Sequence, residues 1–367
     1  MGLGRSNYCL ILLATIVHKD KNKRLGGGNV QQRYEKQMLC SFIGESGQIK
    51  LRQKHVLIVG AGALGSASAE MLVRAGIGTL TIVDRDYVEW SNLQRQQLYT
   101  ESDVLQVLPK AVAAKNRLQQ INRDVNIHAH VLDATVDLLQ PLLKDVNVLV
   151  DATDNFDTRF MLNDFAQKYQ IPFIFAACAG SFGSTYTIIP GRTPCLHCLL
   201  KKIPVSGATC DSEGIVNAVI QLIASYQVTE CLKLLVEDES ALRSTYLSVD
   251  LWHNQHYNLQ VESVKDKECL SCGQQPTYPY LQFETQTKIA VLCGRNTVQL
   301  RPSNQQQLSL DRLEGLLKNK QNIKRNPYLL SYEVDSYRLV FFKDGRVFVH
   351  GTSDILTAKK LYYRLIG

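Results

Sequence analysis

The sequence predicts an α/β protein: a doubly wound, mostly parallel sheet followed by a small C-terminal α+β domain. Two observations lead to this fold class. Short β-branched runs alternate with helical patterns between residues 55 and 177, and a glycine-rich turn joins the first run to the helix after it. The sheet is therefore expected to be Rossmann-like. Its parallel strands are expected at residues 55–60, 79–84, 126–132, 146–151 and 172–177.

The chain changes character after residue 177. We expect an added strand at 184–190, a long loop rich in Gly, Pro and Thr at 191–213, a helix at 214–236 and further strands within 240–262. Near the C-terminus, Asp344-Gly345 predicts a hairpin turn and Asp354 the N-cap of the last helix. The expected divisions are an N-terminal extension (1–30), a nucleotide-binding domain (31–275) and a small α+β domain (276–367).

The charge distribution argues against a nucleic-acid partner. The formal net charge is +7, but residues 1–30 hold five basic side chains and one acid, which leaves +3 for the rest of the chain. A nucleic-acid-binding protein needs basic residues concentrated along one face or groove. A mild preference for an acidic protein partner is compatible with this balance.

The N-terminal region does not fit the fold. Its apolar run at residues 8–17 is too short to span a bilayer, has no small-residue cleavage site after it and is followed by charged residues. Neither export nor membrane insertion is expected. Because the three glycines at 26–28 correspond to G-rich coding sequence that resembles a ribosome-binding site, we hypothesise that translation starts near Val30.

The glycine-rich turn is a candidate phosphate site. In Gly60-Ala61-Gly62-Ala63-Leu64-Gly65, the glycines let the backbone approach a phosphate, and the N-terminus of the following helix favours negative charge. Asp84 ends the next strand, nineteen residues after Gly65, where a carboxylate can accept hydrogen bonds from ribose hydroxyls. Such a turn also serves plain strand-to-helix packing, but together with Asp84 it predicts a bound nucleotide.

Polar segments that follow point to the type of reaction. They are Ser91-Asn92-Leu93-Gln94-Arg95-Gln96, then Lys110, then Asp154-Asn155 with Arg159 nearby. Nucleotidyl transfer needs cations and a carboxylate-held Mg²⁺, because negative charge builds on the phosphoryl groups as pyrophosphate leaves, whereas hydride transfer does not. Taken singly, Arg95 and Lys110 could be solvated surface residues and Asp154 a helix cap.

Two Cys-x-x-Cys pairs predict a metal site. Cys195 with Cys198, and Cys269 with Cys272, have the spacing of a closed tetrathiolate Zn²⁺ site in which each pair chelates from one tight loop. The metal would then staple the long crossover loop to the end of the domain. A redox dithiol is the alternative, although it would need only one pair. His197, between two of the ligands, is expected to be an exposed spectator.

At these residues the chain resembles the ThiF, MoeB and HesA adenylyltransferases, relatives of the ubiquitin-activating enzymes. The match runs from Arg33-Tyr34-Glu35-Lys36-Gln37 to the C-terminus and is strongest to the longer bacterial ThiF proteins of thiazole biosynthesis. The resemblance implies that Gly62 and Ala63 lie against the ATP phosphates and that Asp84 holds the ribose. It implies the remaining roles as follows: Asn92 and Arg95 on the triphosphate, Lys110 on the attacked α-phosphate, Asp154 on Mg²⁺, Asn155 beside the nucleotide, and Gly60, Gly65, Ser91, Leu93 and Gln94 completing the cofactor-binding set.

Three further positions follow from the resemblance. Ala63 replaces a glycine found in many members, which is tolerated if its φ is negative. Lys36 stands where the family usually has an arginine that reaches the triphosphate of the opposite subunit, and a lysine cannot make a bidentate phosphate contact. Cys210, before the helix that starts near Gly214, matches the cysteine that ThiF links to the activated carrier. In MoeB a similar cysteine is unnecessary.

Cysteines that bind a metal and form no disulfides predict a cytoplasmic protein. The resemblance implies a homodimer that uses ATP, Mg²⁺ and a structural Zn²⁺ to adenylylate the C-terminal glycine of a ubiquitin-like sulfur carrier. A ThiS-like carrier for thiamin thiazole synthesis is expected, with a cysteine desulfurase as the sulfur source. The alternative is a MoaD-like carrier, the molybdopterin synthase small subunit. An NAD-dependent Rossmann oxidoreductase is a more distant alternative, because it leaves the zinc pairs and Lys110 unexplained.

Overall fold

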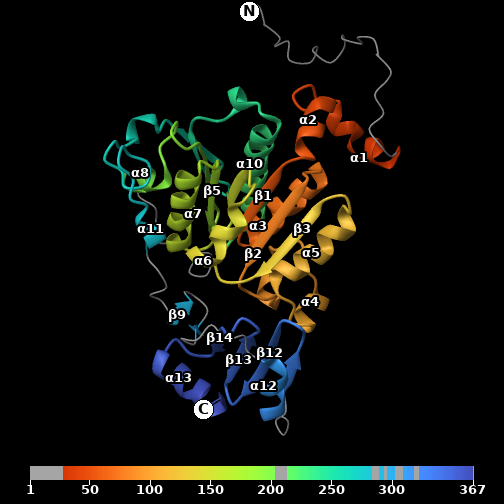
Figure 1. Cartoon of the computed structure of the whole chain (residues 1–367), viewed down its shortest axis with the longest axis vertical. Coiled ribbons are helices and arrows are strands. Elements are labelled where there is room, and N and C mark those ends of the chain that lie inside the picture. The colour runs from red at the N-terminus through yellow and green to blue at the C-terminus, as the bar shows by residue number, and fades with distance from the viewer. Residues whose placement is uncertain are drawn as a thin grey trace, which may run out of the picture.

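The computed structural model describes residues 28–202, 213–282, 289–292, 296–301, 309–317 and 322–366. Two sheets organise these residues (Figure 1). The N-terminal extension predicted at 1–30 lies almost wholly outside the described residues, as does Cys210. The structure therefore neither supports nor contradicts the hypothesis about the translation start.

The larger sheet has eight strands. In spatial order they are β3 (Asn126–Val131), β2 (Thr79–Asp84), β1 (His55–Val59), β4 (Val148–Asp151), β5 (Phe173–Ala179), β6 (Phe182–Ile188), β7 (Tyr246–Asp250) and β8 (Gln255–Leu259). The first five pair in parallel and the last three add in antiparallel fashion. The prediction of a doubly wound, mostly parallel sheet is confirmed, with strand ends shifted by a few residues at most.

Helices cover both faces of this sheet because alternate side chains of each strand point to opposite faces. Val56 and Ile58 of β1 pack in one core with α3, α5 and α10, whereas Leu57 and Val59 pack in a second core with α7. The helices associated with the large sheet are α1 (Gly28–Met38), α2 (Gly44–Leu51), α3 (Ala63–Ala75), η1 (Trp90–Asn92), α4 (Glu101–Leu105), α5 (Lys110–Ile121), α6 (Val136–Leu139), η2 (Gln140–Leu143), α7 (Phe156–Tyr169), α8 (Leu196–Leu200), α10 (Asn217–Val236), η3 (Glu239–Ala241), η4 (Glu262–Val264) and α11 (Pro279–Gln282).

The long helix α10 has the length and apolar composition of a membrane span. Its residues Val219, Ile220 and Ile223 are nevertheless fully buried against the sheet. Gln227 donates hydrogen bonds to the backbone oxygens of Asp151 and Ile174. These contacts are those of a core helix, and its start agrees with the predicted helix at 214–236 within three residues.

The prediction of a continuous loop at 191–213 is wrong in one place. Helix α8 forms within it, with Cys195 at its N-cap. Leu196 and Leu199 of this short helix are buried in the α7 core, so apolar contact orders a segment whose composition resembles a loop. Residues 203–212 lie outside the described part.

A smaller sheet, the C-terminal unit, comprises the described residues from 289 to 366. Its strands are, in spatial order, β11 (Ile323–Arg325), β12 (Leu329–Val334), β13 (Tyr337–Phe342), β14 (Val347–His350), β10 (Thr297–Leu300) and β9 (Ile289–Leu292), with helices α12 (Leu310–Leu316) and α13 (Ile355–Ile366). The predicted hairpin is present as β13 and β14. Asp354 accepts the backbone N–H of Thr357 at 2.9 Å, which confirms it as the cap of α13.

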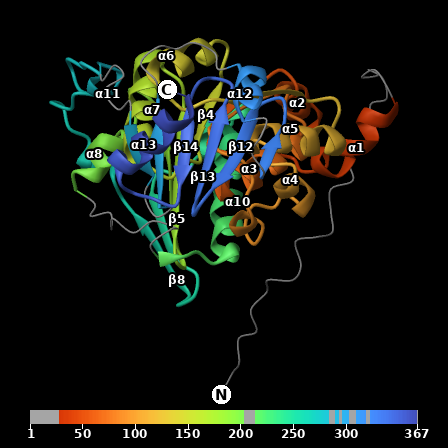
Figure 2. The same cartoon turned by 90° about the horizontal axis from the view of Figure 1, so that it is seen from below.

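The two faces of the smaller sheet have different partners. One face packs on α12 and α13. The other presents Phe342 and Phe348 to Tyr87 and Val131, which follow or end strands β2 and β3. Figure 1 accordingly shows the C-terminal unit against the end of the large sheet where β2 and β3 finish, and Figure 2 shows the molecule from the side of this unit.

A half-buried carboxylate strengthens this contact. Asp133, just after β3, pairs with Arg85 at 3.4 Å and with Arg301, and it accepts a hydrogen bond from Gln299 at 2.8 Å. Burial alone would raise the pKa of Asp133, but the guanidinium groups of Arg85, Arg301 and Arg346 outweigh it and lower that pKa.

The lowered pKa predicts an acid-sensitive contribution to stability. A carboxylate whose folded pKa is depressed stabilises the fold above its unfolded pKa of about 3.9 and loses that contribution as the pH falls through the folded pKa. Asp133→Asn should therefore lower the free energy of unfolding at pH 7 by about 2 kcal/mol, with the difference from wild type shrinking below about pH 4. Urea unfolding at a series of pH values measures this. A difference that does not depend on pH would contradict it.

Candidate active site

The glycine turn connects β1 to α3 and needs glycine at two positions. Gly60 has φ +96°, and a side chain there would meet the Ala152 carbonyl oxygen at 2.3 Å. A side chain at Gly65 would meet the Gly60 oxygen at 1.9 Å. Ala63 is the first residue of α3 and is not among the described residues with positive φ, as expected for an alanine at this position.

Two carboxylates at the end of β2 and just after it reach the glycine turn and α5. Asp84 accepts the backbone N–H of Ala61 at 2.6 Å. Asp86, two residues further, accepts a hydrogen bond from Lys110 Nζ at 3.1 Å, and its backbone oxygen accepts the Lys110 N–H at 2.9 Å. Lys110 is only 2% exposed, so it is a buried cation held at the start of α5 and not a solvated surface residue.

Burial and the Lys110 ammonium have the largest effects on the pKa of Asp84. Burial raises the pKa of Asp84, and so does the charge of Asp86, while the Lys110 ammonium and the Ala61 N–H act in the opposite direction. A second buried acid, Asp151 at the end of β4, has its pKa raised by burial, with opposition from Arg159, whose Nε lies 3.2 Å away. The Arg159–Asp151 pair orders the loop that leads into α7.

The segment 91–96 lies beside the glycine turn. Gln96 is the side chain nearest to a Cβ built on Gly62, at 3.9 Å. Asn92 is buried, and its Oδ1 accepts the Glu89 N–H at 3.0 Å. Arg95 is half-buried and donates to the Ser91 oxygen at 2.7 Å. Ser91 and Gln94 are exposed and Leu93 packs partly on the core.

Asp154 and Asn155 follow β4, next to the glycine turn through the Ala152 contact with Gly60. Asn155 Oδ1 accepts the Thr158 N–H at 2.9 Å, so Asn155 and not Asp154 caps α7. Asp154 is exposed and accepts a hydrogen bond from Asn155 Nδ2 at 3.4 Å. The simple interpretation of Asp154 as a helix cap therefore does not hold.

Lys36 does not join this cluster within its own chain. Its neighbour Tyr34 packs on Gly76, which ends α3, and bonds with Asn122, which ends α5. The glycine turn lies at the other end of α3, about 20 Å away for a helix of 13 residues. Lys36 itself is 85% exposed and pairs only loosely with Glu35 at 3.8 Å.

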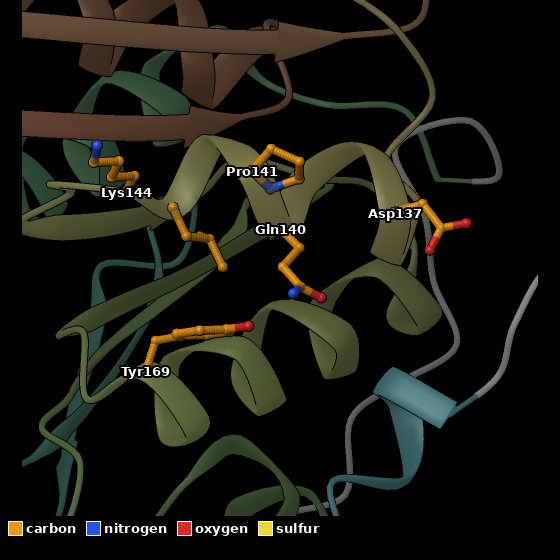
Figure 3. A pocket seen from close by; sticks show the side chains of 6 residues that line it. Asp137, Gln140, Pro141, Lys144 and Tyr169 are labelled. Atoms are coloured by element: carbon orange, nitrogen blue, oxygen red, sulfur yellow. The ribbon is translucent and has the colours of Figure 1, made fainter.

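A surface pocket of about 550 Å³ lies elsewhere. It is lined by Asp137, Gln140, Pro141, Leu143, Lys144 and Tyr169 (Figure 3). Tyr169 is the last residue of α7 and Lys144 precedes β4, whereas the glycine turn faces the start of α7 and the end of β4. The pocket therefore lies at the N-terminal end of β4, whereas the glycine turn lies at its C-terminal end. The pocket is separate from the candidate nucleotide site.

The four cysteines form a compact cluster. Their sulfur atoms lie within 4.8 Å of one another. Three Sγ–Sγ distances are 3.8 Å (Cys195–Cys198), 3.6 Å (Cys195–Cys269) and 3.5 Å (Cys198–Cys272). A tetrahedral ion with Zn–S bonds of 2.3 Å requires sulfur atoms about 3.8 Å apart. The donor set and its geometry fit a closed Zn²⁺ site that joins α8 to residues 269–272.

His197 is not the exposed spectator that its position between the ligands suggested. His197 is half-buried, and its ring packs edge-on against Phe160 and Tyr280. Because Phe160 belongs to α7 and Tyr280 to α11, the cluster is tied to two helices. The sequence pattern of the ligands carries no sign of these partners.

Two residues of the site were missed by sequence reasoning. One is Asp86, although its spacing of two from Asp84 on an extended segment could have placed it on the same side. The other is Tyr99, which is buried and donates to the Ala61 oxygen of the glycine turn at 2.6 Å. Nothing local in the sequence signals this contact.

A family model and several relatives match the chain. The family model "ThiF family" matches residues 34–271. The chain is 51% identical over 338 residues to the "Sulfur carrier protein ThiS adenylyltransferase" of Bacillus subtilis (strain 168), covering 91% of this chain and 99% of that protein. It is 34% identical to the "Sulfur carrier protein adenylyltransferase" of Thermus thermophilus, covering 67% and 92%. The mosquito Culex quinquefasciatus "Adenylyltransferase and sulfurtransferase MOCS3" is 33% identical, and the chain spans 56% of it.

Among solved structures, E. coli MccB matches with a TM-score of 0.58 at 21% identity, covering 66% of this chain and 73% of that one. At this identity the match concerns the fold alone. The ThiF family model covers well over half of the chain, and it spans the glycine turn, Asp84, Lys110, Asp154 and three of the four clustered cysteines. The chain is a member of the ThiF family.

Proposed function

We propose that this protein uses ATP to adenylylate the C-terminal glycine of a ThiS-like ubiquitin-like sulfur carrier for thiamin thiazole synthesis. The observation that carries the proposal is the buried Lys110, held by Asp86 two residues beyond Asp84 at the glycine turn. A buried cation beside a phosphate-binding turn suits phosphoryl chemistry. The identity to the B. subtilis ThiS adenylyltransferase over 99% of its length supports the choice of carrier.

The reaction assigns a task to each part of the site. One carboxylate oxygen of the carrier glycine attacks the α-phosphorus of ATP, the bond to the β-phosphate oxygen breaks, and pyrophosphate leaves with that electron pair. Asp84 would hold the ribose and the backbone of Gly62 and Ala63 the phosphates. Asn92, Arg95 and Lys110 would offset the developing charge. Mg²⁺, which Asp154 would hold, supplies further charge neutralisation on the phosphates.

The remaining assignments belong to the same proposal. The cysteine cluster would hold a structural Zn²⁺ remote from the reaction. Lys36, exposed and far from its own glycine turn, would reach the triphosphate of a second subunit in a two-fold homodimer. A cysteine desulfurase would supply the sulfur, in the cytoplasm. Residues 31–275 would form the adenylation domain and 276–367 a separate α+β domain.

A MoeB-like role on a MoaD-like carrier is the second candidate, favoured by the matches to MOCS3 and to the T. thermophilus sulfur carrier adenylyltransferase. ATP/pyrophosphate exchange with each purified carrier separates the two. Exchange that depends on a ThiS-like carrier is expected. Exchange with a MoaD-like carrier alone would reassign the substrate, and exchange with neither would overturn the proposal.

We predict a division of labour for Cys210, which lies outside the described residues. Acyl-adenylate formation needs no protein thiol, whereas a thiol or persulfide can afterwards displace AMP from the activated carbonyl. Cys210→Ser should keep ATP/pyrophosphate exchange within about twofold and lose any reducible adduct between enzyme and carrier. Intact mass with and without reductant reports the adduct. An adduct that persists in Cys210→Ser would implicate another cysteine.

A further inference from the structure

The segment between Asp84 and Asn92 contacts two parts of the molecule at once. Residues 85–89 lead from β2 to η1 without regular structure, and Tyr87 forms an antiparallel bridge to Pro109. Side chains of an extended chain alternate between its two sides. The Asp84 and Asp86 side chains accept hydrogen bonds from the glycine turn and from Lys110. The side chains on the other side, those of Arg85, Tyr87 and Glu89, contact partners outside the nucleotide site.

The alternate side chains meet the C-terminal unit. Arg338 of β13 donates to Glu89 Oε1 at 2.6 Å and to the Tyr87 hydroxyl at 2.7 Å, and its guanidinium lies 5.5 Å from the Tyr87 ring centroid. The Tyr87 hydroxyl also bonds with His350 Nε2 at 2.7 Å. One arginine thus joins two residues of the segment through a charge-assisted contact in a half-buried setting.

A second arginine holds the beginning of the same segment. Arg346 is buried and donates to the Arg85 backbone oxygen at 3.2 Å. Its guanidinium is kept in place by Asp344 at 2.6 Å and by the Phe342 ring, 4.5 Å away. The turn before β14 therefore holds the beginning of the segment at Arg85, and β13 holds its end at Tyr87 and Glu89.

Glu89 links the C-terminal unit to the nucleotide site through its hydrogen bonds with Asn92. Its backbone oxygen accepts the Asn92 N–H at 2.9 Å, and its own N–H is bonded by Asn92 Oδ1 at 3.0 Å. A shift of Glu89 would therefore displace Asn92 and, with it, the η1 turn that leads to Arg95. Displacements of about 1 Å at a reacting centre are costly.

We infer that the C-terminal unit is a brace for the nucleotide site, and that Arg338 is a positioning residue that holds Glu89 and Tyr87 so that Asn92 and Arg95 face ATP. The inference rests on the proposed function. It gives the smaller sheet a task in nucleotide binding, although none of its own side chains need touch the nucleotide.

The test is Arg338→Ala in the full-length protein, assayed by ATP/pyrophosphate exchange. We expect the KM for ATP to rise about five- to twentyfold, with kcat changed less than about threefold, because the reacting groups remain and only their alignment for binding is lost. Arg338→Lys should recover part of the affinity, since it keeps the charge but cannot bond to both partners equally well. If Arg338→Ala fails to fold, Arg338→Lys carries the test with a smaller expected rise.

The matched control is Arg325→Ala. Arg325 also belongs to the C-terminal unit and pairs with two carboxylates, Asp311 and Glu314, but both lie within that unit. Its KM for ATP should equal that of wild type. A merely structural role for Arg338 would lower the melting temperature and the active fraction of Arg338→Ala but leave its KM for ATP unchanged.

The failure of the brace can be told apart from the failure of the proposed function. If the wild-type protein exchanges pyrophosphate and Arg338→Ala has an unchanged KM for ATP, the inference about Arg338 fails and the proposed function stands. Wild-type protein that shows no exchange with any carrier would overturn the proposed function. ATP binding measured by calorimetry without a carrier then tests the inference about Arg338. A higher Kd for ATP in Arg338→Ala than in wild type supports the inference, and an unchanged Kd rejects it.

Discussion

Replacing Lys110 by alanine is expected to lower the rate of ATP/pyrophosphate exchange by about 100-fold or more. The ammonium group is buried and fixed by Asp86, so in the proposed reaction it meets the developing charge on the phosphates without having to move or shed water. The alanine variant also removes the ammonium group that pairs with Asp86. Exchange assays at saturating ATP and carrier measure the loss.

Folding has to be controlled in this experiment, because Lys110 fills space in the core. Lys110→Met keeps most of the side-chain volume and should lose as much activity as Lys110→Ala while melting closer to wild type. Lys115→Ala, on the same helix but away from Asp86, should keep near-normal exchange. Activity within a few fold of wild type in Lys110→Met would show that Lys110 does not stabilise the transferred phosphoryl group.

Removing one thiolate of the cysteine cluster is expected to have the largest effect on stability. Cys198→Ser should release the bound Zn²⁺ and lower the melting temperature by about 10 °C or more, because a closed tetrathiolate site contributes its binding free energy directly to folding. Three buried cysteines of the cluster join α8 to the segment before α11, and His197 joins them to α7. The loss would therefore spread to the apolar core around α7.

Metal content by elemental analysis and thermal unfolding measure this effect, with one zinc per chain expected in the wild type. Cys40→Ser is the matched control, because Cys40 is an exposed thiol outside the cluster. It should keep both zinc and melting temperature. A Cys198→Ser protein with full zinc and normal melting would rule out the site, and a wild type without zinc but with a reducible disulfide would favour the redox dithiol.

Local patterns in the sequence were enough for the parallel strands of the large sheet and for the start of the last helix. The period of the apolar residues places β1 to β5 within a few residues, and Asp354 is recognisable as a cap because its partner lies three residues away. The prediction of a loop at 191–213 failed at α8, where contact with a distant core outweighs local composition. The same reason explains His197, whose aromatic partners are 37 and 83 residues away.

By itself, the sequence determined the fold class, the family, the glycine turn with Asp84 and the two pairs of sulfur ligands, because each is written in residues close together along the chain. Only the tertiary structure decided that Lys110 is buried on Asp86, that Asn155 and not Asp154 caps α7, and that Arg338 grips Glu89 across 249 residues. Contacts between segments so far apart depend on how whole elements pack, and local periodicity contains no record of which side chains that packing brings together.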